Sequence, residues 1–127
     1  MDPVTIAVAV VALAGTNAVA GFATEAGSQA WDALQKALVA VRARLSKRGR
    51  AALARIEEGR PQPSDIATAN EEIAGLAESN VELRETLTAM LELVAHSRPL
   101  AAVLATARDN ARQVNIGGNH IGPINLG

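Results

Sequence analysis

Apolar residues recur at steps of three and four along most of this chain, which is the spacing of one buried face of an α-helix. Over residues 28–58 this spacing predicts one long helix with a bend at Gly49, where a glycine weakens the helix. Its buried face comprises Trp31, Leu34, Leu38, Val41, Leu45, Ala52 and Ile56. Residues 59–63, with the sequence Gly-Arg-Pro-Gln-Pro, are the clearest break in the chain and predict a loop.

The same spacing resumes at Ser64 or Asp65 and continues without a slip to about Val94. It favours a single long helix over two short ones, although residues 79–82 (Ser-Asn-Val-Glu) also resemble a capping box. The buried positions are Ile66, Ala69, Ile73, Leu76, Asn80, Leu83, Leu87, Met90 and Val94. On this interpretation Asn80 is a polar residue on a buried face, which fixes helix register at some cost in stability.

A fourth helix is expected to start at Ser97 and Pro99 and to end near Arg112. Its apolar face comprises Leu100, Val103, Leu104 and Ala107. With the first segment described below, the pattern predicts an all-α fold, an antiparallel helical bundle of about four helices with short connections. We expect this bundle to occupy residues 1–108 and to be followed by a β-prone tail over residues 109–127.

The first helix is predicted from residues 3–24, which carry no charge and follow Asp2, a good residue to begin a helix. Three interpretations compete. A helix that is apolar all round is normally buried in a bundle. At about 1.5 Å per residue the segment is also long enough to be a transmembrane anchor. A secretory signal peptide is the third, although Met1 and Asp2 supply no basic region.

The tail carries a repeated pattern. The pattern of residues 114–117 (Val-Asn-Ile-Gly) is repeated in residues 124–127 (Ile-Asn-Leu-Gly). In each segment two apolar residues flank one Asn, and a Gly follows. This is the alternation of a short β-strand, and an uncharged strand with a free edge favours stacking with other copies. Pro123 marks a bend between the two strands. We expect the tail to be disordered in the monomer, because an isolated pair of strands is marginally stable.

The amino-acid composition excludes several kinds of site and function. Among 127 residues 49% are hydrophobic, enough for a core, and the net charge of −1 attracts no nucleic acid. The absence of Cys excludes disulfides and thiolate sites. The two histidines, His96 and His120, lack the spacing of metal ligands. The sequence therefore predicts a protein that is not an enzyme, with no catalytic residue, metal or cofactor, and His120 is expected to stack or hydrogen-bond in an assembled strand.

Seven basic residues, more than half of the positive charge, lie close together in the second predicted helix. They are Lys36, Arg42, Arg44, Lys47, Arg48, Arg50 and Arg55. Beside an apolar helix such a cluster can hold anionic lipid headgroups, and Arg42, Arg44, Lys47, Arg48 and Arg50 are the candidates. The alternative is a solvated face balanced by acidic residues of the third predicted helix. These are Glu71, Glu72, Glu78, Glu82, Glu85 and Glu92. Nucleic acid is not an expected partner, because no aromatic residues are interleaved with the basic ones.

The tail resembles the amyloid signalling motifs found at the ends of some bacterial and fungal cell-death proteins. It also resembles the RHIM core of animal necroptosis proteins, which is a β-branched residue, an amide, a second β-branched residue and Gly; Asn115 stands where that core usually has Gln. The candidate motif residues are Val114, Asn115, Ile116, Gly117, Asn119, His120, Ile121, Gly122, Ile124, Asn125, Leu126 and Gly127. The resemblance implies self-assembly through the tail, templated by a sensor of the nucleotide-binding oligomerisation type that carries a matching motif.

A helical bundle followed by such a motif is similar in architecture to fungal HeLo domains, to the four-helix domain of mixed-lineage kinase-like protein and to bacterial Bell domains. The resemblance implies a pore-forming effector of programmed cell death in innate immunity or antiphage defence. It would be cytoplasmic at rest and act at the inner face of the cell membrane. In those families the first apolar helix is released to insert into lipid, and the corresponding residues here are Val4, Ile6, Val8, Val10, Val11, Leu13, Val19 and Phe22.

Two other functions stay open at this stage. The first is a helical adaptor that recruits partners by homotypic stacking of its tail without touching membranes. The second is a small membrane protein anchored by residues 3–24. The sequence does not separate these alternatives from the effector.

Overall fold

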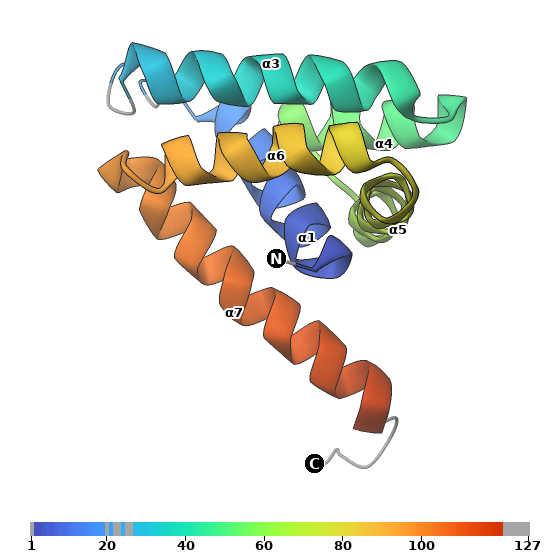
Figure 1. Cartoon of the computed structure of the whole chain (residues 1–127). Coiled ribbons are helices and arrows are strands. Elements are labelled where there is room, and N and C mark those ends of the chain that lie inside the picture. Colours follow the sequence, from blue (N-terminus) through green and yellow to red (C-terminus); the bar gives the residue numbers. More distant parts are fainter. Residues whose placement is uncertain (1, 20, 22–23, 25–26, 121–127) are drawn as a thin grey trace.

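The computed structural model describes residues 2–19, 21, 24 and 27–120, with side chains up to Asn110. Over this range the chain forms helices and no strand, so the predicted all-α class is confirmed for the described residues. The elements are α1 (Pro3–Ala14), the 3-10 helix η1 (Gly15–Ala18), α3 (Ser28–Arg44), α4 (Lys47–Glu57), α5 (Pro63–Ser79), α6 (Val81–Val94) and α7 (Arg98–His120) (Figure 1).

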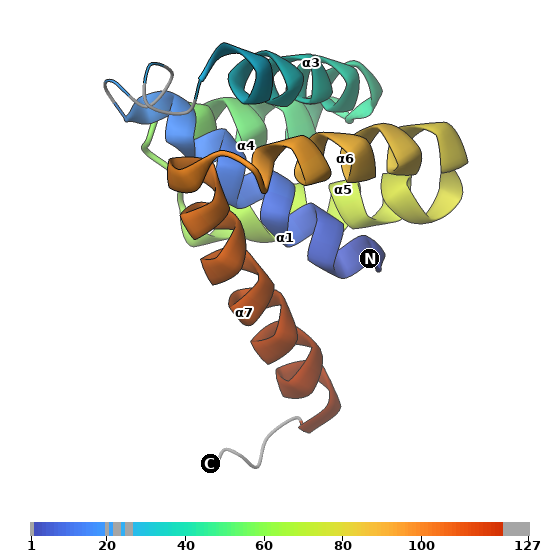
Figure 2. The same cartoon turned by 60° about the vertical axis from the view of Figure 1, so that its left-hand side comes forward.

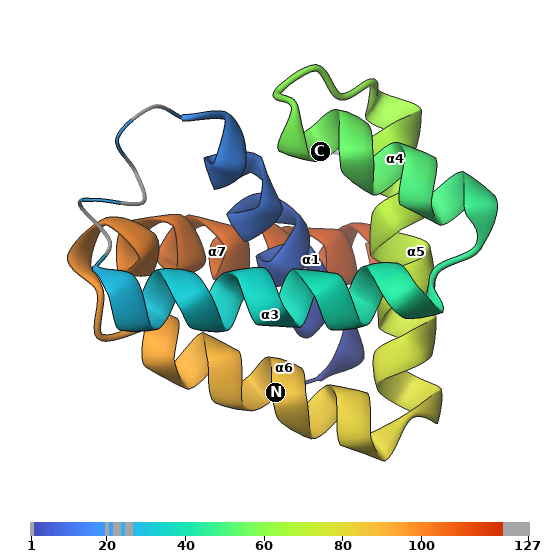
Figure 3. The ribbon, with the colours of Figure 1, turned by 90° about the horizontal axis from the view of Figure 1, so that it is seen from above.

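The helices cross one another steeply and do not form a simple antiparallel bundle. α3 and α6 lie side by side and run in opposite directions, while α5 is seen almost along its axis in the same view (Figure 1). From above, α1 passes beneath α3 and crosses it (Figure 3). α7 packs on α1 and its C-terminal half extends beyond the other helices (Figure 2). The predicted antiparallel arrangement therefore holds for the pair α3 and α6 but not for the whole fold.

The first predicted helix begins where the sequence indicates and ends early. The Asp2 carboxylate accepts a hydrogen bond from the Thr5 N–H at 2.7 Å, and Pro3 occupies the first turn. The helix does not continue to residue 24, because η1 follows Ala14 and Val19 is extended. The buried Thr16 hydroxyl donates to the Leu13 carbonyl oxygen at 2.6 Å. A side chain that bonds a nearby carbonyl in this way offers the backbone an alternative to the helix.

The predicted helix over residues 28–58 is two helices, and the break precedes Gly49. Leu45 is extended, and the Ser46 hydroxyl accepts a hydrogen bond from the Gly49 N–H at 3.1 Å. Ser46 is thus the N-cap of α4 and satisfies a donor that a new helix would otherwise leave unpaired. Leu45 stays buried at 5% exposure, so the helical spacing of apolar residues persists across the break.

The predicted single helix from Ser64 or Asp65 to Val94 is also two helices. Asn80 is extended, with φ −121° and ψ 101°, and its side-chain oxygen accepts from the Leu83 N–H at 3.0 Å. Asn80 is therefore the N-cap of α6, and its predicted role as a polar residue on a buried helix face is wrong. A new helix does start within residues 79–82, but its N-cap is Asn80 and not Ser79, so the capping box of Ser79 with Glu82 does not form.

The core contains most of the positions that the apolar spacing predicts. Ile73, Leu87 and Leu100 are fully buried, while Trp31 is partly buried and packs against the core. Ile66 is an exception, since it is 40% exposed on α5. The predicted loop at residues 59–63 is confirmed up to Gln62, and Gly59 has a positive φ of 78° that favours glycine.

Candidate functional site

The apolar helix α1 is enclosed by the rest of the protein. Ile6, Val10 and Leu13 are fully buried, and α1 contacts α3, α4, α5, α6 and α7. Of the other predicted membrane-insertion residues, Val11 is buried at 6% exposure. The prediction that this segment is a buried bundle helix is confirmed for residues 3–14.

One side of α1 is only partly covered. Val4, Val8 and Ala12 are half-buried and recur at steps of four, so they lie on one helix face. Val8 and Ala12 line a cavity of about 320 Å³ that α4, α5 and α7 also border. Val19 lies beyond the helix and is 53% exposed, and the predicted insertion residue Phe22 lies outside the described residues.

The length of α1 bears on the membrane interpretations. Among the residues that the structure describes, no helix combines the length and the apolar character that a membrane span requires. α1 itself has 12 residues.

A network of polar side chains holds the end of the apolar segment, and we call Asn17, Gln35, Arg42 and Glu57 the Glu57 network. The Asn17 amide donates to Glu57 Oε1 at 2.9 Å, and Gln35 Nε2 donates to Asn17 Oδ1 at 2.8 Å. Arg42 Nη2 donates to both oxygens of Glu57 at 2.7 Å. The network joins η1 to α3 and α4. The spacing of apolar residues gives no indication of this network. A sequence feature that points to it is Asn17, a polar residue inside an uncharged segment.

The carboxylate of the Glu57 network is shielded from water more than its arginine is. The Glu57 side chain is 15% exposed and the Arg42 side chain 41%. A partly buried ion pair that also accepts an amide hydrogen bond is stronger than a surface pair, because water competes less for its partners. Arg42 is thus bound to Glu57 in this state, although the sequence predicted it among the lipid-headgroup residues.

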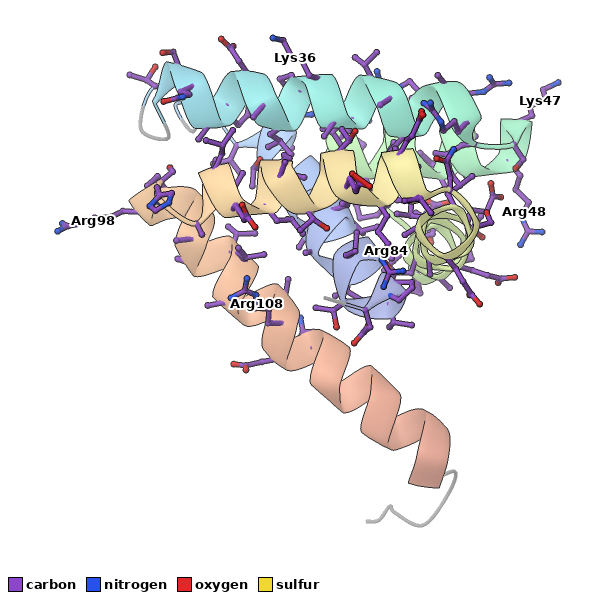
Figure 4. The ribbon with its side chains drawn as sticks, in the orientation of Figure 1. Lys36, Lys47, Arg48, Arg84, Arg98 and Arg108 are labelled. Atoms are coloured by element: carbon purple, nitrogen blue, oxygen red, sulfur yellow. The ribbon has the colours of Figure 1, made fainter. Side chains whose placement is uncertain are left out.

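The other four predicted headgroup residues meet at the corner between α3 and α4. Arg44 ends α3, and Lys47, Arg48 and Arg50 lie at the start of α4; all four are exposed. We call these four residues the basic corner. Lys47 and Arg48 point outward at this end of the molecule, whereas Lys36 points outward from α3 well away from them (Figure 4). Arg48 Nη2 also donates to the Thr68 hydroxyl at 3.3 Å.

Of the acidic residues that the sequence offered as counter-charges, Glu72 lies beside this corner, where it binds Ser46. Its carboxylate accepts from the Ser46 N–H at 3.0 Å and from the Ser46 hydroxyl at 2.7 Å. This places a negative charge at the N-terminus of α4, where the helix dipole favours it. A Cβ at Gly49 would meet the same carboxylate, so a larger residue at this position would displace the Glu72 side chain.

A second ion pair joins α4 to α5. Arg55 Nε and Nη2 donate to the two oxygens of Asp65 at 2.8 and 2.6 Å, and the Gln62 N–H donates to Asp65 Oδ2 at 2.9 Å. These bonds, those from Arg55 first, lower the pKa of Asp65 from 3.8 to about 2. Arg55, a member of the predicted basic cluster, is therefore a structural residue that fixes the start of α5.

The amyloid motif lies at the end of α7 and beyond it. The predicted helix end near Arg112 is wrong, because α7 runs to His120. The backbone at Val114, Asn115, Ile116, Gly117, Asn119 and His120 is helical and does not form the predicted strand. Ile121, Gly122, Ile124, Asn125, Leu126 and Gly127 lie outside the described residues.

In the described part of the chain, no three His, Asp or Glu side chains gather as metal ligands would. A scan against protein-family models found no match, and searches of curated proteins and of solved structures found none either.

Proposed function

We propose that this protein is a membrane-targeting, pore-forming cell-death effector, and that α1 is its membrane-active segment. The observation that carries the proposal is the position of α1. It contains no charged side chain between Pro3 and Ala14, yet it contacts all the longer helices and is buried among them. While the bundle encloses such a helix, the helix stays out of lipid. When the bundle opens, the helix moves into lipid, because exposure of its apolar surface to water is unfavourable.

The tail supplies the trigger in this proposal. A sensor with a matching motif nucleates residues 114–127 of many copies into a cross-β stack, in which amide ladders and apolar contacts repeat about every 4.7 Å. The stack concentrates the bundles at the inner face of the cell membrane. A peptide of residues 110–127 should therefore form fibrils with that spacing by fibre diffraction, and a peptide that stays monomeric when seeded would contradict the trigger.

The basic corner is the proposed contact with anionic lipid. Arg44, Lys47, Arg48 and Arg50 are exposed, and each is worth about 1 kcal/mol near an anionic surface. Lys47, Arg48 and Arg50 lie in the first turns of α4, where the helix dipole disfavours positive charge. Helix stability therefore does not account for their position. Arg42 is not part of the proposed surface at rest, because Glu57 binds it.

Insertion requires α1 to lengthen. Its 12 residues span about 18 Å, whereas a bilayer core is about 30 Å thick. Residues 3–24 as one helix would span about 33 Å. Lengthening therefore requires η1 to become α-helical, and this in turn requires Asn17 to leave the Glu57 network.

Leakage of dye from anionic vesicles tests the proposal. Ala12→Asp is the decisive variant, because Ala12 lies at the middle of residues 3–24 and is half-buried beside a cavity, so the bundle has room for the new side chain. An Asp at the centre of a spanning helix costs about 2.5–3.5 kcal/mol on insertion scales, so leakage should fall by more than about tenfold. Ala89→Asp, at an exposed position of α6, is the matched control and should leak like the wild type.

A second pair of variants tests the lengthening step. Glu57→Gln weakens the Glu57 network, and Asp65→Asn weakens the other ion pair of α4, which does not reach η1. In vesicles seeded with tail fibrils, Glu57→Gln should leak sooner than the wild type, and Asp65→Asn should not. Equal leakage by the wild type, Ala12→Asp and Glu57→Gln would refute insertion of residues 3–24.

The second candidate function is a helical adaptor, which the short length of α1 favours. An adaptor would assemble through its tail and recruit a partner while α1 stays buried. Seeded fibrils of the full chain that cause no leakage from anionic vesicles, with α1 amides still protected from hydrogen exchange, would establish this alternative in place of the effector.

A further inference from the structure

The cavity of about 320 Å³ beside α1 has an uncharged wall. α1, α4, α5 and α7 border it, together with the loop that precedes α5. Among the described residues that line it, Asn70 and Asn110 carry the only polar side chains. The apolar side chains are those of Val8, Val11, Ala12, Ile56, Pro61 and Ile66. An occupant that suits such a wall is uncharged and apolar, with a hydrogen-bonding group for the two amides.

The cavity leaves apolar surface uncovered on the helix that the other helices enclose. Val8 and Ala12 of α1 are half-buried. On the α5 side, Ile66 is 40% exposed, although Ala69 and Ile73 of the same helix are fully buried. Removal of apolar surface from water is favourable, so an apolar segment that filled the cavity would also help to hold α1 in place.

The rest of the chain continues from the border of this cavity. Asn110 lines the cavity, and α7 carries the backbone from there to His120, about 15 Å further and beyond the other helices (Figure 2). Residues 121–127 follow, and an extended segment of this length spans up to about 23–25 Å. The span exceeds the distance back to Asn110 by about 8 Å, which leaves length for a turn and for entry into the cavity.

Residues 121–127 have the chemistry that the cavity requires. Their sequence, Ile-Gly-Pro-Ile-Asn-Leu-Gly, contains no charged side chain, and its Asn125 supplies an amide. The match in charge is important because a wall without counter-charges disfavours a charged segment. The Gly-Pro pair at residues 122–123 is typical of a turn, which a return toward Asn110 needs.

We propose that residues 121–127 dock in this cavity of their own chain in the resting protein. Ile124 and Leu126 fill the cavity, and the Asn125 amide pairs with the amides of the wall. The docked segment thereby covers the exposed face of α1.

The consequence of docking rests on the proposed function. The residues that join the cross-β stack are then the same residues that cover α1. A tail that leaves the cavity for the stack uncovers Val8 and Ala12, so the assembly of tails loosens α1 in the same step. Docking thus connects the trigger to the membrane-active helix.

A spin label on the tail of the full chain tests docking. The chain contains no Cys, so Gly127→Cys can be labelled with a nitroxide at one position. At a protein concentration too low for assembly, amide NMR should show loss of most of the signal at Val8, Ala12 and Ile66. Val39, on the exposed face of α3, should keep its signal. Full signal at the cavity residues would overturn the proposal.

Two substitutions with the same change in size separate docking from the mere proximity of a tethered label. Ala12→Leu adds apolar volume beside the cavity and should restore the signal at Val8 and Ile66 in the labelled chain. Ala89→Leu, at an exposed position of α6, is the matched control and should leave the loss unchanged. Equal loss in both variants would overturn docking.

A substitution in the tail leaves the bundle unchanged and tests the same contact. Leu126→Asp brings a charge to the uncharged wall, so the signal at the cavity should return and the amides of α1 should exchange with solvent several-fold faster. Asn119→Asp adds the same charge before the docked segment and should change neither quantity. Unchanged signal loss and exchange in Leu126→Asp would contradict the proposal.

A mixture of two chains identifies whose tail fills the cavity. One chain carries the spin label and the other the isotope label, so any loss of signal arises between copies. No loss in the mixture supports docking within one chain, whereas loss equal to that of the doubly labelled chain would overturn it in favour of a second copy.

Docking and the proposed function fail separately, because the spin-label measurement involves no membrane. Docking without vesicle leakage would refute the effector and leave this inference in place. Leakage from a chain whose tail does not dock would refute the inference and leave the effector in place.

Discussion

α1 and α7 pack against each other but are covered to very different extents. α1 is enclosed by other helices, and Ile6, Val10 and Leu13 have no exposed surface. α7 buries one face through Leu100, Leu104 and Ala107, and its C-terminal half extends beyond the bundle (Figure 2). The comparison shows that the most apolar segment is buried among the other helices, whereas the helix that leads into the tail motif extends beyond them. In our proposal the extended helix receives the signal and the enclosed helix acts on the membrane.

The largest effect is expected from a charge inside the enclosed helix. Val10→Asp buries a carboxylate without a partner, and we expect it to cost more than about 4 kcal/mol of unfolding free energy and to prevent folding. The measurement is urea unfolding followed by circular dichroism. Val39→Asp, at a position that is 59% exposed on α3, is the control and should change stability by less than about 0.5 kcal/mol. Two variants of equal stability would show that α1 is not enclosed.

A smaller effect is expected on the covered face of α7. Leu104 is 2% exposed, and Leu104→Ala should lower the unfolding free energy by about 2–4 kcal/mol, because it removes buried methyl groups and leaves a cavity. Amides of α1 should then exchange with solvent faster, since α7 covers α1. Thr106→Ala on the exposed face of α7 should leave both quantities within error. Slow exchange in Leu104→Ala would contradict a covering role for α7.

The Glu57 network should have a moderate effect confined to one end of the apolar segment. Glu57→Gln keeps the shape of the side chain and removes its charge, so the bonds from Arg42 weaken and stability should fall by about 1–2 kcal/mol. Hydrogen exchange should accelerate at residues 15–18 of η1 and not at the start of α1. Uniform acceleration along residues 3–18 would mean that the network does not act locally.

The smallest effect concerns the Arg55–Asp65 pair, which joins α4 to α5. The pKa of Asp65 is about 2 in the folded protein against 3.8 ordinarily. The unfolded state therefore binds more protons between these values, and the stability that Asp65 contributes is present above pH 3.8 and lost as pH falls toward 2. Urea midpoints of the wild type and Asp65→Asn should differ at neutral pH and converge in acid. A difference that stays constant with pH would exclude this linkage.

The breaks between helices show where the local sequence no longer determines the backbone conformation. The apolar spacing predicted the buried positions Leu34, Leu38 and Ile73, but it also predicted continuous helices through Ser46 and Asn80. A serine or asparagine can cap a new helix or stay inside an old one at a difference of about 1 kcal/mol. Contacts between distant segments outweigh so small a preference, and they set α5 at a steep angle to α6 (Figure 1).

What the sequence by itself determined is the all-α class, the start of α1 at Asp2 and Pro3, the loop after Gly59 and most of the core, because periodicity and local capping act within a few residues. The tertiary structure decided where the helices end, how they cross, and which charges pair. Asn17 and Glu57 are 40 positions apart, and Ser97 meets the start of α3 only after the chain has folded. Such contacts depend on the path of the whole backbone. The periodicity of apolar residues along one segment does not determine that path.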